Sequence, residues 1–293
     1  MKIAVVGLGG VGGYIGANLA KTSHEVVGFA RGEHLAQIQK NGLTIVEDNC
    51  SWNVPLQAKT LQEAEGIFDI VLFCVKSYDL QNSFEAIDSH VNSQTILISF
   101  ANGVSHGDIL RDLSQSIVLD GCVYILSHIE EAGVIRKKGK VFAIVFGGEN
   151  QATQTLASLF EQASLRAKLS TNIQTDIWRK YIFISAFATI TSFYDKSIGQ
   201  VYEYYFEEIQ TLLQEIANVA FAKGIDIFDE VQKALDIAKS LPYDSSTSMH
   251  LDFQNKNKNE LEILSGFIIH EAKKKGVKTP LMEKMYNKLK ELS

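Results

Sequence analysis

The sequence is short of cysteine, of long apolar runs and of positive charge, and each shortage excludes a class of protein. The cysteines Cys50, Cys74 and Cys122 are odd in number and lack the spacing of zinc ligands or of a disulfide framework, so we expect reduced core residues. The longest uncharged apolar stretch, 181–194, is shorter than the roughly 20 residues that cross a membrane. A net charge of −6 without a basic stripe argues against nucleic acid as the main partner.

Two further kinds of site find no support in the sequence. The seven histidines do not cluster at metal-ligand spacing, and the serine, cysteine and histidine positions give no nucleophilic arrangement. A chain of 293 residues with 46% hydrophobic and 21% charged residues fits a globular protein of two domains. We expect a cytoplasmic protein that acts on a small molecule and has no metal, no membrane and no nucleic acid as partner.

A glycine-rich loop directly follows an apolar run at the start of the chain. Residues 3–6 are typical of a buried strand, and the glycines after them have the spacing GxGxxG. A strand before this spacing and a helix after it indicate a dinucleotide site, where the helix N-terminus holds the pyrophosphate. A signal peptide is the alternative, but the glycines interrupt its apolar segment and a second strand, 25–30, follows at βαβ distance. The expected cofactor-binding residues here are Gly7, Leu8, Gly9, Gly10, Val11 and Gly12.

The end of the second strand indicates which dinucleotide binds. An acidic residue at this place accepts from the ribose hydroxyls of NAD, whereas an arginine suits the 2′-phosphate of NADP. The first polar side chain here is Arg31, which favours NADP. The alternatives are a solvated arginine at a strand end and a ribose contact from Glu33.

The apolar pattern divides the chain near residue 170. Before it, continuous apolar runs predict an α/β fold with a doubly wound, Rossmann-type sheet in residues 1–170. After it, helical periodicity predicts an all-helical substrate and catalytic domain in residues 171–293. The expected strands are 3–6, 25–30, 70–75, 95–99, 117–124 and a hairpin of 134–138 with 141–146 around Gly139. The expected helices are 175–194, 204–223, 229–240, 246–255, 260–275 and 280–292.

Polar residues follow two consecutive predicted strands, where ligands of such sheets bind. Lys76 comes after the strand 70–75, and Asn102 with Gly103 comes after the strand 95–99. The alternatives are a lysine that reaches solvent along its alkyl chain and an ordinary Asn-Gly turn.

The helical half offers candidates for proton transfer. Lys180 precedes an almost wholly apolar helix, where partial burial would lower its pKa and make it a better proton donor. The alternative is the wet end of a core helix. Glu260 opens a helix, where a carboxylate is favourable without any catalytic role, and Ser248 could cap a helix or bind a carboxylate.

Taken in order, these residues resemble the ketopantoate reductase (2-dehydropantoate 2-reductase) family over nearly the whole chain. The matching segments are GxGxxG at 7–12, Arg31, VKS at 75–77, NGV at 102–104, WRK at 178–180, Ser248, Asp252, ELEILSG at 260–266 and GVKTP at 276–280. The resemblance implies hydride transfer from NADPH to ketopantoate, the reaction of pantothenate and coenzyme A biosynthesis.

The resemblance also implies roles for single residues. Lys180 would donate the proton to the carbonyl oxygen, and Glu260 would orient Lys180 or hold the substrate hydroxyl. Lys76 and Asn102 would position substrate and cofactor. Ser248 and Asp252 would lie on the substrate side, with Ser248 on the carboxylate. The uncharged helical surface would make a homodimer unsurprising.

The sequence departs from the family pattern one and two turns after Lys180. The family usually has asparagines there that bind the substrate, whereas this chain has Ile184 and Ala188 on the same helix face. Loss of such donors weakens recognition of a hydroxylated substrate. Two alternatives follow: a reductase of a more apolar 2-oxo acid, and a non-catalytic NADP-binding sensor, against which the intact Lys180 and Glu260 argue.

Overall fold

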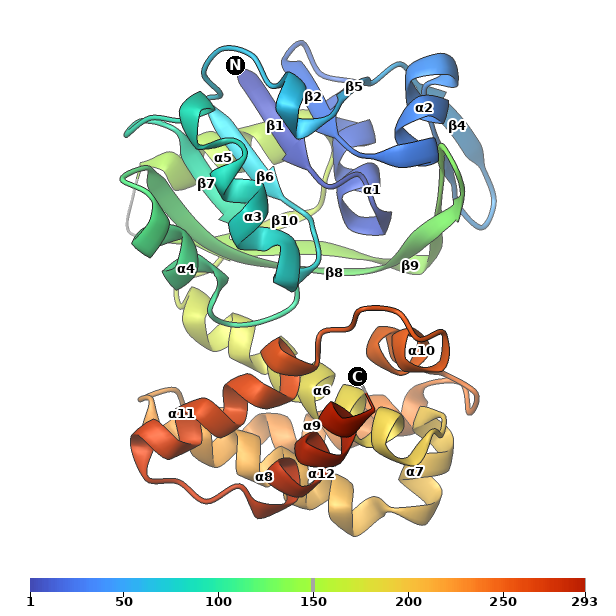
Figure 1. The fold of residues 1–293 in the computed structure, drawn as a ribbon, viewed down its shortest axis with the longest axis vertical. Coiled ribbons are helices and arrows are strands. Elements are labelled where there is room, and N and C mark those ends of the chain that lie inside the picture. The colour runs from blue at the N-terminus through green and yellow to red at the C-terminus, as the bar shows by residue number, and fades with distance from the viewer. Residues whose placement is uncertain (149–150, 293) are drawn as a thin grey trace. The chain divides into compact units, whose positions relative to one another are not determined.

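A computed structural model describes residues 1–148 and 151–292 of the chain (Figure 1). These residues divide into two compact units, one of residues 1–101 and 105–173 and one of residues 102–104 and 174–293. The first unit is built on a mixed sheet and the second is helical, as the α/β prediction required. No helix in the described part of the chain is both long enough and apolar enough to cross a membrane.

The sheet of the first unit has the order β4-β3-β9-β8-β7-β6-β1-β2-β5, and β10 pairs with β9. The run from β8 to β5 is parallel throughout, whereas β9 is antiparallel to β8 and β4 is antiparallel to β3. The strands are β1 Lys2–Val6, β2 Glu25–Phe29, β3 Leu43–Val46, β4 Ser51–Val54, β5 Gln57–Lys59, β6 Ile70–Phe73, β7 Ile96–Ser99, β8 Ile117–Glu131, β9 Val134–Gly147 and β10 Ala167–Leu169.

Helices cover both faces of the parallel strands, which is why these strands are apolar without alternation. One face packs against α1 Gly10–Leu19, α2 Gly32–Asn41 and α5 Ala152–Gln162, and the other against α3 Leu80–Glu85 and α4 His106–Leu113. Every residue of β6 is buried, and so is every residue of β7. This double covering is the doubly wound arrangement that the apolar runs predicted.

The predicted hairpin around Gly139 is wrong. β9 runs through this position, and its hairpin partner is β8, with Gly133 at the turn. Ile125 pairs with Phe142 while Ser127 pairs with Lys137, so the extra residues of β9 bulge out of the ladder. Gly139 has a φ of +66° and lies in this bulge, which explains why a glycine there does not end the strand.

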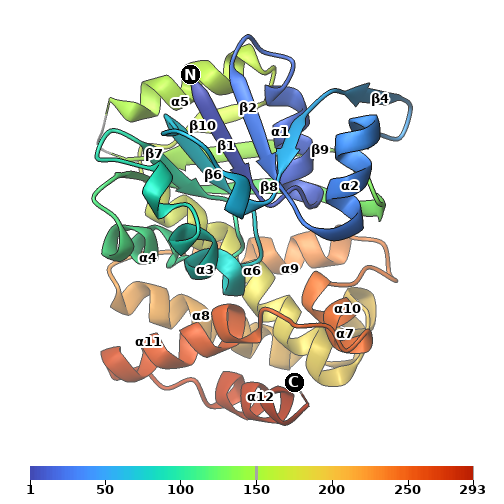
Figure 2. The same cartoon turned by 45° about the horizontal axis from the view of Figure 1, so that its top comes forward.

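The helical unit contains the long helix α6 Ile173–Tyr194, which is labelled in Figure 2. Most residues of α6 are buried. α8 packs against α7, α9, α11 and α12 in the same core. The helices are α7 Ile198–Tyr204, α8 Phe206–Ala222, α9 Asp229–Ser240, α10 Ser248–Gln254, α11 Phe267–Lys275 and α12 Pro280–Glu291, with a π-helical turn, η4, at Glu262–Gly266. α7 was not predicted from the sequence, and neither were the short strands β3, β4 and β5.

The expectation of three core cysteines is correct only in part. Cys122 is buried and Cys74 is half-buried, but Cys50 is exposed beside the short strand β4. The three cysteines, all among the described residues, form no disulfide. The expectation fails for Cys50 because this residue lies on the hairpin of β3 and β4, two strands that were not predicted from the sequence.

Candidate functional site

The glycine loop joins β1 to α1 with no room for side chains at Gly7, Gly10 and Gly12. Gly7 has a φ of +95°, which favours glycine, and an added Cβ at Gly12 would lie 2.0 Å from the carbonyl oxygen of Gly7. At Gly9, by contrast, an added Cβ would have no atom within 4 Å, so the backbone is open on that side. Gly10 and Val11 begin α1, whose first N–H groups have no acceptor within the helix. The loop therefore fits a dinucleotide pyrophosphate.

Leu8 holds the loop in place from within. Its side chain is buried, its N–H donates to the Phe29 carbonyl oxygen over 3.2 Å, and its own carbonyl oxygen contacts His34 Nε2 at 2.9 Å. The other ring nitrogen of His34 accepts the N–H of Gly133 over 3.0 Å. A carbonyl can only accept and an N–H can only donate, so these partners assign the neutral Nε2–H tautomer to His34. Burial lowers the pKa of His34, in agreement with a neutral ring.

Arg31, the residue predicted from the sequence to bind a 2′-phosphate, lies two residues beyond β2 as the N-cap of α2. Its guanidinium is highly exposed and forms an ion pair with Asp79, with 3.2 Å between Nη2 and Oδ2. Asp79 belongs to a 3₁₀ turn of residues 77–79, and Lys76 is the half-buried residue that precedes this turn. A carboxylate therefore contacts the one cation that the sequence assigns to the phosphate. No sequence motif indicates this pair.

The helical unit brings Lys180 and Asn102 together. The Lys180 ammonium donates to Asn102 Oδ1 over 2.9 Å in a partly buried contact. Asn102 follows β7 in the chain but belongs to the same compact unit as α6. Sequence reasoning selected both residues separately and could not show that they meet, because they are far apart in the chain.

Three more candidates lie on segments around α6. Glu260 is buried and lies two residues before the π-helical segment η4. Ser248 is exposed and begins α10, where the cap is supplied by the hydroxyl of the preceding Thr247, so Ser248 does not serve as the N-cap. Asp252 is half-buried one turn further along α10. Among the described residues, no group of metal-ligating side chains occurs.

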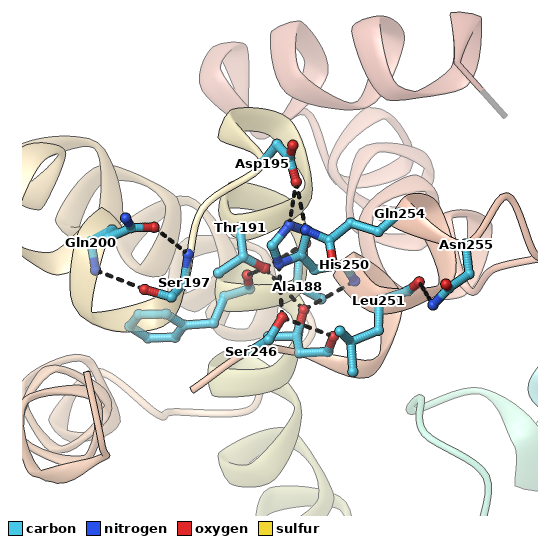
Figure 3. Close-up of polar contacts among 12 residues, drawn as sticks. Ala188, Thr191, Asp195, Ser197, Gln200, Ser246, His250, Leu251, Gln254 and Asn255 are labelled. Atoms are coloured by element: carbon cyan, nitrogen blue, oxygen red, sulfur yellow. Dashed lines mark hydrogen bonds and ion pairs between the residues drawn. The ribbon is translucent and has the colours of Figure 1, made fainter. Parts of the chain in front are cut away.

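A polar network fastens α10 to the end of α6 (Figure 3). The buried ring of His250 contacts Ser246 Oγ through Nδ1 at 2.7 Å and Asp195 Oδ1 through Nε2 at 2.8 Å. Thr191 and Thr247 join their hydroxyls over 2.9 Å. The hydrogen bond from His250 lowers the pKa of Asp195. The network thus fixes the helix that carries Ser248.

The same network contains a serine, a histidine and an aspartate, a set that the sequence did not reveal. Its contacts are reversed relative to a hydrolytic triad, in which the serine meets Nε2 and the aspartate meets Nδ1. Ser246 lies two residues before α10 and His250 lies in its first turn, so their contact is local to the start of this helix. We interpret the set as a fastening of α10.

The two positions at which the family usually has asparagines have apolar surroundings in the structure. Ile184 is half-buried and Ala188 is 3% exposed, and both pack within the helical core. They provide no side-chain donor or acceptor on the α6 face that carries Lys180.

Comparison with known proteins identifies the family of this chain. The family model described as "Ketopantoate reductase PanE/ApbA" matches residues 3–150, and its C-terminal counterpart matches residues 172–293. The chain is 30% identical to the "Uncharacterized oxidoreductase YkpB" of Bacillus subtilis, over 99% of this chain and 98% of that one.

Solved structures of similar proteins have the same fold as this chain. A PanE/ApbA family ketopantoate reductase from Ralstonia eutropha superposes with a TM-score of 0.93 at 27% identity, covering 100% of this chain and 98% of that one. A D-mandelate dehydrogenase solved with NADH and anilino(oxo)acetate has the same fold, with a TM-score of 0.90, 22% identity and coverage of 100% and 98%.

A matched pair of alanine substitutions tests the glycine loop. We expect Gly12→Ala to disrupt the packing of α1 on β1, because its Cβ would overlap a backbone oxygen, at a cost of about 3 kcal/mol or more. Gly9→Ala should leave the free energy of unfolding nearly unchanged but raise the Kd for the dinucleotide about tenfold, since the methyl group occupies the open side. Urea unfolding and cofactor fluorescence titration measure both. Equal effects of the two variants on folding would contradict the assignment.

His34 predicts a pH dependence of stability. Its pKa is lower in the folded protein than in the unfolded chain, so the unfolded chain binds more protons below the usual pKa of about 6.5. The stabilisation is complete above that pKa and is lost as the pH falls below it. We expect the free energy of unfolding to decrease between about pH 7 and 5.5, and this decrease to be smaller in His34→Gln. Urea unfolding across this range measures the difference, and identical slopes in the two proteins would refute the prediction.

Proposed function

Because this chain belongs to the ketopantoate reductase family, we propose that it is an NADPH-dependent reductase of 2-dehydropantoate (ketopantoate) that forms pantoate. That it is an oxidoreductase of the NAD(P)-dependent ketopantoate reductase type follows from the family itself. The observation that carries the proposal is the contact of Lys180 with Asn102, which places a lysine ammonium and an amide in one polar contact. A cytoplasmic location and a homodimer belong to the same proposal.

The residues of this chain divide the work of the reaction. The first helical turn of α1 and Arg31 bind the dinucleotide, which supplies a hydride when bound. Lys180 stabilises the negative charge that develops on the substrate carbonyl oxygen and donates its proton there. The carbonyl gains one hydride and one proton and becomes a hydroxyl group.

The other proposed residues bind and orient. Lys76 and Asn102 position the reactants, since geometry contributes much of the rate. Glu260 orients Lys180 or holds the substrate hydroxyl, and Ser248 with Asp252 faces the substrate, with Ser248 on its carboxylate. The network around His250 supports these last two residues by fixing α10.

A more apolar 2-oxo acid is the second candidate substrate. The observation that favours it is the pair Ile184 and Ala188, which pack in the core where the family usually has asparagines. An apolar pocket cannot read a hydroxyl group, whereas a site built to bind one rejects the analogue without it by about 10⁴-fold. The hydroxyl group of ketopantoate is therefore the discriminating feature.

Two acids that differ by this one hydroxyl decide between the candidates. Ketopantoate and 3,3-dimethyl-2-oxobutanoate share the branched 2-oxo acid, and the second compound lacks only the hydroxyl. If ketopantoate is the substrate, its kcat/KM in NADPH oxidation should exceed that of the analogue by about 10³-fold or more. An equal or higher kcat/KM for the analogue would overturn the ketopantoate assignment in favour of the apolar acid. Reduction of neither acid, with NADPH still bound, would support the sensor.

Lys180→Arg tests the proton donor in the same assay. Arginine keeps the positive charge but holds its proton too firmly to donate it. We expect kcat to fall by about 10²-fold or more while the Kd for NADPH is unchanged. Retention of full turnover by this variant would remove Lys180 as general acid.

From the ion pair of Arg31 with Asp79 we predict that Asp79 weakens the preference of the protein for NADPH over NADH. A phosphate near Arg31 meets the carboxylate that already contacts the guanidinium, so Asp79→Asn should lower the Kd for NADPH about fivefold and leave that for NADH unchanged. Asp108→Asn, which removes the same charge from the exposed end of another ion pair in this unit, is the matched control and should change neither Kd. Parallel shifts for both cofactors would argue against the role of Asp79.

A further inference from the structure

A π-helical turn begins two residues after Glu260. In η4 the N–H of Phe267 bonds to the carbonyl oxygen of Glu262, five residues back, and the chain then continues as α11. Such wide turns are rare and occur frequently at functional sites. Gly266 ends the turn, and an added Cβ there would lie 2.7 Å from the Glu262 carboxylate.

Side chains of α6 hold this turn from the side. The Tyr181 hydroxyl lies 2.8 Å from the carbonyl oxygens of both Ile263 and Leu264, and Ser185 Oγ donates to the same Leu264 oxygen over 2.7 Å. Thr189 and Ser265 join their hydroxyls over 2.7 Å. The three residues of α6 are spaced by four, so they form one stripe along the helix, which we name the α6 clamp: Tyr181, Ser185 and Thr189.

The α6 clamp is out of contact with water. None of its three residues is more than 1% exposed, and of the residues it holds Leu264 and Ser265 are buried and Ile263 is half-buried. Burial raises the pKa of the Tyr181 phenol, so its hydroxyl keeps its proton and remains a donor. A carbonyl in such surroundings must find a donor within the protein, and the α6 clamp supplies it.

The clamp connects the two residues proposed for proton transfer. Tyr181 directly follows Lys180 in the chain. At the other end, the Leu264 N–H donates to the carbonyl oxygen of Glu260 over 3.0 Å. The backbone of Lys180 and the backbone of Glu260 are therefore joined through a tyrosine, a leucine and two hydrogen bonds.

We propose that Tyr181 and Ser185 are positioning residues that set Glu260 relative to Lys180 through the π-helical turn. This inference rests on the proposed reductase function. The alternative is a clamp that merely stabilises the helical core. The two roles have different consequences. A contact that only stabilises the core changes the fraction of folded protein, whereas a positioning contact changes the surroundings of the Glu260 carboxylate in protein that is folded.

A matched pair of tyrosine variants separates these roles. Tyr181→Phe removes the hydroxyl that holds the turn, whereas Tyr194→Phe removes a hydroxyl of the same helix that donates to Glu208 instead. Ser185→Ala is the second clamp variant, for the case that Tyr181→Phe does not fold. The measurements are kcat and KM for the 2-oxo acid, and the pH titration of the Glu260 carboxylate by ¹³C NMR, assigned with Glu260→Gln.

The proposal expects a clear pattern. Tyr181→Phe should lower kcat by up to about a hundredfold with little change in KM, and it should move the titration midpoint of Glu260. Tyr194→Phe should do neither. A Glu260 titration in folded Tyr181→Phe or Ser185→Ala that matches the wild type would overturn the proposal. If the wild-type protein reduces no 2-oxo acid, the proposed function fails separately, and the Glu260 titration still decides whether the clamp positions this carboxylate.

Discussion

The helical unit depends on the burial of α6. This helix is apolar almost all round, so it can exist in water only with other helices packed on it, and its hydroxyl groups must find partners inside. Tyr181, Ser185 and Thr189 find them in the turn η4, and Thr191 finds one in Thr247. The same hydrogen bonds that satisfy the buried hydroxyl groups of α6 thus fix the segments that carry Glu260 and Ser248.

The sheet unit has a different constraint, which is the close approach of α1 to β1. It leaves no space for a side chain at Gly12 and forces Gly7 into a conformation that other residues avoid. Because the reasons are steric and local, the sequence alone was enough to predict the loop between this strand and this helix. The doubly wound sheet was equally predictable, since strands buried on both faces must be apolar throughout.

What the sequence could not predict depends on contacts between distant segments. The long pairing of β8 with β9 replaced an expected local hairpin, because pairing register is decided by the partner strand and not by a glycine. The contacts of Asn102 with Lys180, Arg31 with Asp79 and His250 with Asp195 join residues whose separation in the chain hides them. Ser265 and Gly266 mark the end of the π-helical turn in the sequence, but the pattern of residues around them is equally compatible with an ordinary α-helix.

The replacement of two asparagines by Ile184 and Ala188 acquires a physical meaning from this arrangement. These positions lie on the helix that also carries Lys180 and the α6 clamp, and both pack in the helical core. A change there from amide to apolar side chain removes donors without opening the stripe that holds η4, since the two sets of residues differ by one position along the helix. Substrate recognition can therefore vary on one stripe of α6 while the support of the proposed proton-transfer pair is preserved on the next. This separation allows the chain to keep Lys180 and Glu260 with their support while it departs from the family pattern at positions 184 and 188.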